Sequence, residues 1–483
     1  MAASELENLK LNVSVRAKLR LQKSPQLRGF PVHLLPVEIA AEIFLLCIPP
    51  PGPDWDETVH PNVPPLLLLR ICRSWRRIAL STPRLWATFR LRHRHHQRFV
   101  SPPRDRKQFQ RLADLLDTWV ERAGGVAISL DPDLAKVDLK RAPETIAPLV
   151  HSFRRNSSNI GHLAFTCDVE ELAAFDRLGL HFPRLETLSL MLRGHLADSE
   201  SEITQFRDCP LLRRVHIKGI PVSRIRLPWS QLSQLRTYFY PAKTTLEILE
   251  KAPNLASAIL HTRRLTDDYK TGLPTLKHEA LCDLTVEDDF ESVFGEYPSL
   301  LPFLTLPVLV RLGVNLGYRG SFDLQEIESL VKRSGCNLQR LKLNMSPGRP
   351  LASPESFAAL SSLTHLEFDR PDGEILTVLF SSYGSDPAFL PRLEDLQLVN
   401  ICREIRSDTL SVSAEALHRR QAAVVQSCGP TGTKMLRSFC MQFFVGGFGD
   451  SNIESIAPDL LRLVALRKTG LELYVGTSHM SFV

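Results

Sequence analysis

The most regular pattern in the sequence is a recurring spacing of apolar residues, apolar-x-x-apolar-x-apolar. Clear copies begin at Leu185, Leu338, Leu363 and Leu393. Looser copies begin at Ile160, Leu212, Leu235, Leu255, Leu281, Leu309 and Leu436. The last two apolar positions of a copy lie two residues apart, the spacing that places both side chains on one face of a β-strand. Each copy therefore predicts a short strand with a buried face, and residues 471–475 predict a terminal strand.

The copies recur at a period that indicates a repeat protein. In order, the spacings between starting positions are 25, 27, 23, 20, 26, 28, 29, 25, 30 and 43 residues. Most lie in or just above the period of roughly 20–29 residues typical of leucine-rich repeats. Helix-like stretches separate the copies, for example residues 244–251, and the long last gap contains a predicted extra helix from Ala414 to Ser427. Each unit is thus predicted as helix plus strand, stacked so that neighbours share one core.

A different pattern near the start predicts two short amphipathic helices. Pro36 suits the first turn of a helix, and Ile39, Ile43 and Leu46 or Cys47 follow at helical spacing. After a proline-rich connection, apolar residues from Leu68 to Ala79 predict a second helix of about three turns that ends before Pro83. A module of about 60 residues can bury little alone. Its apolar helical surface is therefore interpreted as a docking face.

The residues of this module resemble an F-box of the type common in fungi. The resemblance covers residues 31–90 and rests on the Leu35-Pro36-x-Glu38-Ile39 start, on Cys72-x-x-Trp75-Arg76 and on Pro83-x-Leu85-Trp86. An expanded connection with seven prolines from Pro49 to Pro65 departs from the usual pattern. The alternative is an ordinary helical hairpin. The repeats, at about 125–475, resemble the irregular leucine-rich repeats that follow F-boxes, although the usual asparagine is present only at Asn344 and Asn400 among the clear copies.

The resemblance implies a substrate-recognition adaptor of a ubiquitin ligase. The F-box would dock on a Skp-type adaptor and through it on a cullin ligase, while the repeats would hold a protein substrate of unknown identity. The positions that would carry the adaptor contact or support it are Leu35, Pro36, Ile39, Ile43, Leu69, Trp75, Arg76 and Trp86. Trp75 and Trp86 are equally well interpreted as core anchors of the module.

The expected fold class is an α/β repeat, similar to a leucine-rich-repeat solenoid, preceded by a small all-α module. The expected domains are an N-terminal lead-in at 1–30, helical or disordered, the F-box-like domain at 31–90, a basic linker at 91–107 and the repeat domain at 108–483. The linker precedes a predicted helix from Gln108 to Ala123, closed by Gly124-Gly125, and a strand through Ile128 and Leu130.

Composition and charge exclude several classes of protein. Lys and Arg outnumber Asp and Glu by 59 to 53 over 483 residues, a net charge of +6 that does not by itself call for nucleic acid. Nine cysteines without a CxxC pair indicate neither a zinc site nor a disulfide framework. The acidic start lacks signal-peptide character, and no apolar stretch is long enough to span a membrane. We expect a cytoplasmic or nuclear protein.

No sequence motif indicates catalysis, a metal, a cofactor or a small-molecule substrate, so we expect a protein that is not an enzyme. GxSxG and HExxH are missing. The pairs Asp267-Asp268 and Asp288-Asp289 are interpreted as solvated acids, and His93, His95 and His96 as part of a basic loop, with a metal or phosphate site as the alternative. The glycine-containing stretches at residues 428–434 and 446–449 are interpreted as turns because they lack phosphate-loop and dinucleotide spacing.

The polar residues between the apolar strand positions predict a binding face. They would share the open, concave side of the array. A basic set, Arg214, His216, Arg311, Arg340 and Lys342, is the candidate for gripping an acidic or phosphorylated protein segment. The alternative is that these charges keep the face soluble. Two rival functions also stay open, a free-standing repeat scaffold with the helical module as its cap, and a nucleic-acid binder that uses the basic linker.

Overall fold

The structure of the chain is a computed structural model. It describes residues 35–48, 58–90, 105–131, 143–193, 202–263, 272–288, 300–315, 324–345, 357, 360–371, 373–401, 407–426, 434–444, 453–477 and 481. The lead-in at 1–30 and the histidine cluster therefore lie outside the described residues, as does the predicted linker except for residues 105–107.

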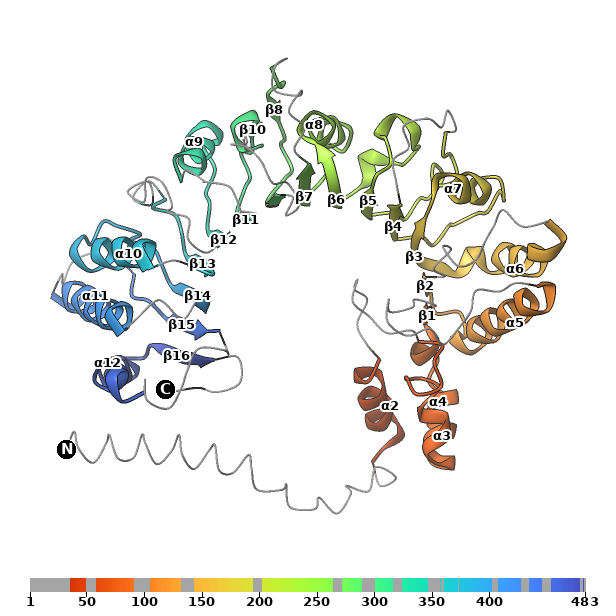
Figure 1. Cartoon of the computed structure of the whole chain (residues 1–483), viewed down its shortest axis with the longest axis horizontal. Helices are drawn as coiled ribbons and strands as arrows, with labels where there is room; N and C mark the ends of the chain where they lie inside the picture. The colour runs from red at the N-terminus through yellow and green to blue at the C-terminus, as the bar shows by residue number, and fades with distance from the viewer. Residues whose placement is uncertain are drawn as a thin grey trace. The chain divides into compact units, whose positions relative to one another are not determined.

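The described residues form an α/β fold built on a 14-stranded sheet whose recorded strand pairings are all parallel, which confirms the α/β, repeat-like part of the predicted class (Figure 1). The leucine-rich-repeat likeness and the F-box-like module stay predictions. In sheet order the strands are β1 (Thr88–Arg90), β2 (Ile128–Asp131), β3 (Ile160–Cys167), β4 (Thr187–Leu192), β5 (Arg214–Lys218), β6 (Gln234–Pro241), β7 (Ser257–Arg263), β9 (Asp283–Asp288), β11 (Arg311–Asn315), β12 (Arg340–Asn344), β13 (His365–Asp369), β14 (Asp395–Ile401), β15 (Ser438–Phe443) and β16 (Glu472–Thr477). A separate pair joins β8 (Leu276–Lys277) and β10 (Leu304–Thr305).

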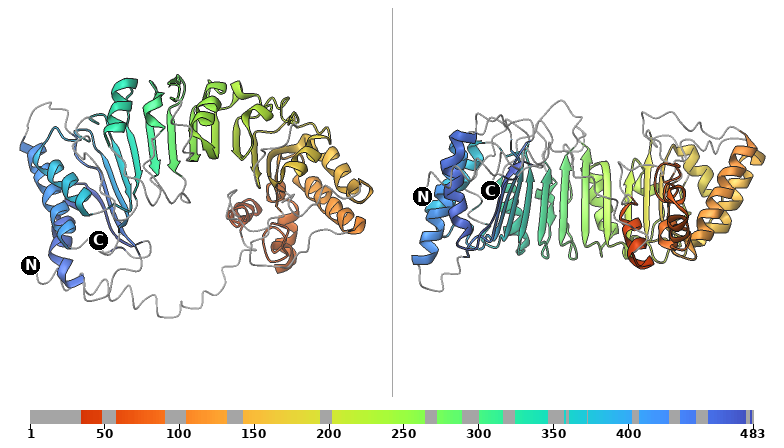
Figure 2. Two further views of the ribbon diagram at one scale, coloured as in Figure 1. Left: turned by 45° about the horizontal axis from the view of Figure 1, so that its top comes forward. Right: turned by 90° about the horizontal axis from the view of Figure 1, so that it is seen from below.

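Eleven α-helices lie in the described part of the chain, and most of them connect one strand to the next. They are α2 (Val37–Leu46), α3 (Leu68–Ile71), α4 (Arg73–Leu80), α5 (Arg106–Ala123), α6 (Pro143–Asn156), α7 (Val169–Asp176), α8 (Ala242–Lys251), α9 (Leu324–Ser334), α10 (Gly373–Ser385), α11 (Ser407–Gln426) and α12 (Ile453–Arg467). Figure 2 shows the helices that join strands on one face of the sheet. Parallel sheets usually have both faces covered, so coverage of one face is a mark of a repeat array.

The strands are in register at equivalent positions of the repeat. Leu341 of β12 lies beside Leu312 on one side and Leu366 on the other, and all three side chains are buried. The same alignment continues to Leu396, Phe439 and Leu473. The apolar spacing in the sequence therefore corresponds to continuous rows of core residues beneath the helices.

One of the predicted copies is shifted. The sequence pattern places its start at Leu235, whereas Leu235 pairs with Val215 and occupies the middle position of the motif. The start is Leu232, and the third position is the fully buried Thr237. A search for three apolar residues misses this copy because a threonine occupies the last core position.

The chain divides into two compact units. The N-terminal unit comprises Leu27–Tyr240 and Glu247–Leu255, and the C-terminal unit includes Pro241–Leu246 and Ala256–Val483. The helices α2 to α4 belong to the same unit as strands β1 to β6. The predicted domain boundaries at 90 and 107 stay predictions.

The second helix of the N-terminal module is broken, where the sequence predicts a continuous one. Cys72 adopts an extended conformation, with φ −157° and ψ 170°, and separates α3 from α4. Its thiol accepts a hydrogen bond from the Trp75 amide at 3.5 Å, so Cys72 caps α4. An apolar pattern at helical spacing cannot distinguish a continuous helix from two helices separated by a capping residue.

The module also contributes a strand that the sequence analysis did not predict. Residues Thr88–Arg90 form β1, which pairs with β2. Next to it, Trp86 is fully buried and its indole ring meets that of Trp119 on α5 edge-on, with 4.8 Å between ring centres. The Trp86 indole also donates a hydrogen bond to the Ala79 carbonyl at 2.9 Å. These contacts join the helical module to the first strands of the sheet.

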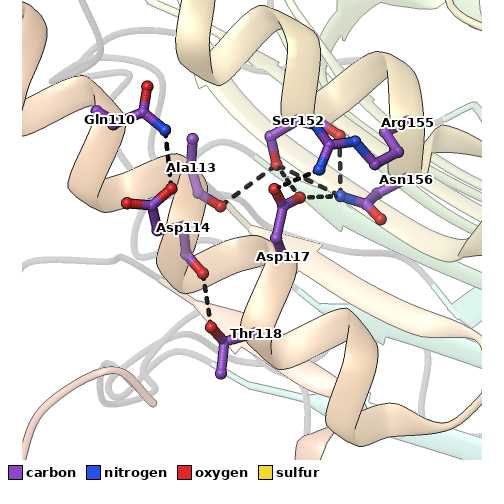
Figure 3. A network of polar contacts seen from close by, with 8 residues as sticks. All are labelled: Gln110, Ala113, Asp114, Asp117, Thr118, Ser152, Arg155 and Asn156. Carbon is purple, nitrogen blue, oxygen red and sulfur yellow. Dashed lines mark hydrogen bonds and ion pairs between the residues drawn. The ribbon is translucent and has the colours of Figure 1, made fainter.

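Helices α5 and α6 are held together by one carboxylate (Figure 3). Asp117 of α5 accepts hydrogen bonds from the Ser152 hydroxyl at 2.7 Å and from the Asn156 amide at 2.6 Å. The Arg155 guanidinium donates to its second oxygen at 3.0 Å. Because Ser152 and Asn156 are buried, this carboxylate satisfies polar groups that have lost contact with water.

Candidate protein-interaction surfaces

Helix α2 carries apolar side chains on two faces, and only one of these faces is covered. Ala40 and Phe44 are buried against the rest of the module. Ile39, Ile43 and Leu46 follow a separate helical stripe and are 50%, 40% and 85% exposed. A helix that is apolar beyond its buried stripe is expected to have a further partner. We call this exposed stripe the α2 face.

The α2 face belongs to a wider concentration of exposed apolar residues. Ten large apolar side chains are exposed in the described part of the chain, and six of them lie between residues 37 and 80. These six are Val37, Ile39, Ile43, Leu46, Ile71 and Leu80. Scattered exposed apolar residues are normal on a protein surface, whereas a concentration in so short a segment indicates an interaction site.

The buried side of α2 is fixed by an aromatic contact. The ring centres of Phe44 and the half-buried Trp75 lie 4.8 Å apart, so this pair joins α2 to α4. Arg84 forms an exposed ion pair with Glu42 at 2.9 Å, a second link from α2 to the segment after α4. The α2 face is therefore presented by a helix that is held on its opposite side.

The predicted adaptor-contact residues divide into three groups. Pro36, Ile39, Ile43 and Arg76 are exposed, and Leu35, Leu69 and Trp75 are half-buried. Pro36 also accepts the first backbone hydrogen bond of α2, from the Ala40 amide at 3.0 Å. Trp86 is fully buried, so in this structure its role is support of the core rather than surface contact.

Four exposed apolar residues of the module were not in the predicted set. Val37 and Leu46 lie on α2, Ile71 ends α3 and Leu80 ends α4. Leu46 continues the spacing of Ile39 and Ile43, so periodicity was sufficient to find it. Ile71 lies at helical spacing between Leu68 and Trp75, on the apolar stripe predicted for the second helix, whereas Leu80 lies off that stripe.

The open face of the N-terminal unit is basic. On β1 to β6 the side chains that alternate with the core positions include four cationic groups, Arg90, Arg214, Lys218 and Arg236, and one carboxylate, Asp131. Arg90 and Asp131 are buried and pair with each other at 3.7 Å. The accessible charge of this face therefore comes from β5 and β6. Arg214 is also within 3.6 Å of Glu186, which precedes β4.

The open face of the C-terminal unit has the opposite balance. Among its described strand side chains, the cations are Arg311, Arg340 and Lys342, and the carboxylates are Asp283, Glu287, Glu367, Asp369, Asp395 and Glu472. Arg311 pairs with Asp283 at 2.9 Å and Lys342 with Glu367 at 2.6 Å, in each case across neighbouring strands. The predicted basic set is thus divided between two units, and in the C-terminal unit most of its charge is balanced.

Two histidines lie among the cations of the N-terminal open face. His216 of β5 is placed between Ser189 and Arg236 in the strand register. Burial, with Arg236 and Arg214 nearby, lowers the pKa of His216 to about 4. Burial, with His216, Arg90 and Arg214 nearby, lowers the pKa of His162 to about 4 as well. Both imidazoles are therefore neutral at neutral pH.

Metal-ligand groups and reactive thiols were two kinds of site that the described residues could have contained. Within them, no group of three or more His, Cys, Asp or Glu is arranged to hold a metal ion. Burial raises the pKa of the Cys167 and Cys209 thiols to about 12, which makes both poor nucleophiles. Asp267-Asp268, Asp289 and the glycine-containing stretches at 428–433 and 446–449 lie outside the described residues. In the parts of the chain that the structure describes, no helix has the length and hydropathy required to cross a bilayer.

Comparison with known proteins adds no family. Neither the family models nor the curated proteins contain a match to this chain. The features that bear on function are therefore the α2 face, the two open faces and the motifs of the sequence.

Proposed function

We propose that this chain is a substrate-recognition adaptor of a ubiquitin ligase of the Skp/cullin/F-box type. The exposed α2 face is the observation that carries the proposal. It follows the Leu35-Pro36 start of the F-box-like motif, and it presents Ile39 and Ile43 to solvent from a helix fixed by Phe44. Burial of these side chains by a Skp-type adaptor would remove apolar area from water, the main favourable term in protein association.

The repeats supply the second half of the proposal. We interpret the parallel strand–helix units as leucine-rich repeats that hold a protein substrate on their open faces. Such an adaptor performs no bond chemistry itself. It raises the effective concentration of the substrate near the enzyme that transfers ubiquitin, in the cytoplasm or nucleus. The proposal therefore requires two binding surfaces and no catalytic group on this chain.

The proposal is tested by co-purification of the full chain with a Skp-type adaptor. Leu35→Ala with Pro36→Ala should abolish the complex, but Pro36 is also the N-cap of α2 with φ −51°, so loss of this fixed φ can act through the helix start. Ile39→Ser with Ile43→Ser alters exposed side chains only and should give the same loss. Failure of the unaltered chain to bind any Skp-type adaptor overturns the proposal.

A free-standing repeat scaffold is the second candidate, and one observation favours it. Strand β1 is the first strand of the sheet, and the Trp86 contact with Trp119 ties the helical module to that end. A module that only capped the repeats would account for these contacts. It would leave the exposed Ile39, Ile43 and Leu46 side chains without a role, which is why we prefer the adaptor function.

A further inference from the structure

We propose that the β4–β6 surface of the N-terminal unit binds an extended acidic segment of a protein, one with carboxylates or phosphates at alternate residues. The inference rests on the proposed function, since it names the chemical class of the substrate held by the repeats. The surface, here called the basic patch, consists of Arg214, Lys218 and Arg236 with His216 between them.

The spacing of the patch fits an extended chain. Arg214, His216 and Lys218 occupy alternate positions of β5, so their side chains share one face at intervals of about 6.6 Å. An extended segment repeats its own side chains at the same interval. Arg236 lies beside His216 on the next strand, about 4.8 Å away. Acidic groups at every second residue of a ligand would therefore meet successive positions of β5.

The β4 side of the patch adds little negative charge. The neighbours in register there are Thr187, Ser189 and Met191, none of which carries charge. Glu186 lies near Arg214, but the two groups are 3.6 Å apart and both are about half exposed, so the pair is weak. The C-terminal open face differs in this respect, because Asp283 and Glu367 lie against its cations.

The aromatic residues of the patch favour a protein ligand over a nucleic acid. Single-stranded nucleic acids bind by stacking bases on exposed aromatic rings. Here the Arg236 guanidinium lies over the Tyr238 ring at 5.1 Å, and the Lys218 ammonium lies over the Phe239 ring at 4.9 Å. One face of each ring is thus already engaged by one of the protein's own cations.

Binding of an acidic segment should also be linked to pH. His216 lies beside Arg214 and Lys218 on its own strand, Arg236 on β6 and the uncharged Ser189 on β4. His162 lies between Ser129 of β2 and Thr187 of β4, with His216, Arg90 and Arg214 nearby. Burial is the larger cause of the low pKa of both imidazoles, and carboxylates placed over these cations oppose only the repulsion that adds to it. The complex therefore takes up few protons above pH 5.5, and affinity should rise only slightly as pH falls from 7 towards 5.5, where the ligand's carboxylates are still ionised.

The test measures fluorescence anisotropy of a labelled peptide of alternating serine and glutamate with the full chain at low salt. Arg214→Glu with Lys218→Glu should weaken binding about tenfold or more. Arg340→Glu with Lys342→Glu on the C-terminal open face should change it less than about twofold, although both variants alter the net charge equally. If the first variant does not fold, Arg214→Gln with Lys218→Gln should give a smaller loss in the same direction.

Two control peptides and an oligothymidylate complete the test. A peptide with the same composition but with its glutamates in one block should bind more weakly, and an alternating serine–glutamine peptide should not bind. Equal affinity for all peptides, or an oligothymidylate that binds more tightly and displaces the acidic peptide, overturns the inference. A Skp-type adaptor is not needed for this assay, so loss of the adaptor complex and loss of peptide binding are separate results.

Discussion

Neighbouring side chains on α2 have opposite roles. Phe44 is 1% exposed and packs against Trp75, whereas the side chain of Ile43 is 40% exposed. Phe44→Ala should lower the free energy of unfolding by about 3–5 kcal/mol, because it removes a buried ring and leaves a cavity. Ile43→Ala should change it by less than about 1 kcal/mol.

Urea unfolding followed by tryptophan fluorescence measures both values. All five tryptophans precede residue 230 and fall in the sequence range of the N-terminal unit, so the signal reports on that unit. If Ile43→Ala lowered the free energy of unfolding as much as Phe44→Ala, the α2 face would be covered within the chain. The docking interpretation would then be wrong.

The two half-buried histidines, His162 and His216, should make the N-terminal unit sensitive to acid. Their pKa values are about 4 in the folded chain and about 6.5 when unfolded. Below pH 6.5 the unfolded chain therefore binds protons that the folded chain does not. The free energy of unfolding should fall as pH drops from about 6.5 to 4 and should be insensitive to these groups above 6.5, with a contribution of up to about 2–3 kcal/mol per histidine.

A comparison of unfolding at pH 7 and pH 4.5 checks this prediction. His216→Asn removes one titrating group, so the variant should lose less stability between the two pH values than the unaltered chain. An equal loss in both proteins would show that the acid sensitivity arises from other groups.

At the level of helices, the α5–α6 contact depends on Asp117. Asp117→Ala removes the acceptor for Ser152 and Asn156, both of which are buried, and should lower the free energy of unfolding by about 1–3 kcal/mol (Figure 3). The side chain of Asp114, one turn earlier, accepts an exposed hydrogen bond from the Gln110 amide at 2.8 Å, and its backbone bond from Thr118 is unaffected by substitution. Asp114→Ala is therefore the matched control and should cost less than about 0.5 kcal/mol by the same unfolding assay.

Most strands of the sheet could be predicted from the sequence, but one was predicted at a shifted position and one was missed. Apolar spacing located β4, β12, β13 and β14 because each core row requires two apolar residues on one face of a strand. It misplaced β6, where Thr237 occupies a core position, and it missed β1. It also missed the helix break at Cys72, since hydrophobic periodicity contains no information about which residue adopts an extended conformation.

The charge of the open faces could be predicted only in part. Alternation correctly placed Arg311 and Lys342 on strand positions that face away from the core. Their partners Asp283 and Glu367 come from other repeats, 28 and 25 residues away, and only the strand register brings them together. The sequence therefore predicted one basic set of residues. The structure divides this set between a basic open face in the N-terminal unit and an acidic open face in the C-terminal unit.

At the scale of the whole molecule, the α2 face and the basic patch would bind different partners of the proposed adaptor. The α2 face is apolar and suits a stable protein partner, because burial of such residues at the centre of an interface carries most of the binding energy. The basic patch is polar and partly exposed, which suits reversible, salt-dependent binding. A stable link to the ligase and a weaker link to the substrate is the arrangement that an adaptor requires.

The most direct measurement is the affinity of the purified full chain for a purified Skp-type adaptor, by calorimetry. Ile39→Asp with Ile43→Asp should weaken binding by about a hundredfold or more, since charges would be buried at the centre of the contact. Leu211→Asp with Val308→Asp, at exposed apolar residues elsewhere, should leave the affinity within about twofold. Equal binding by both variants, or no binding by the unaltered chain, would contradict the adaptor function.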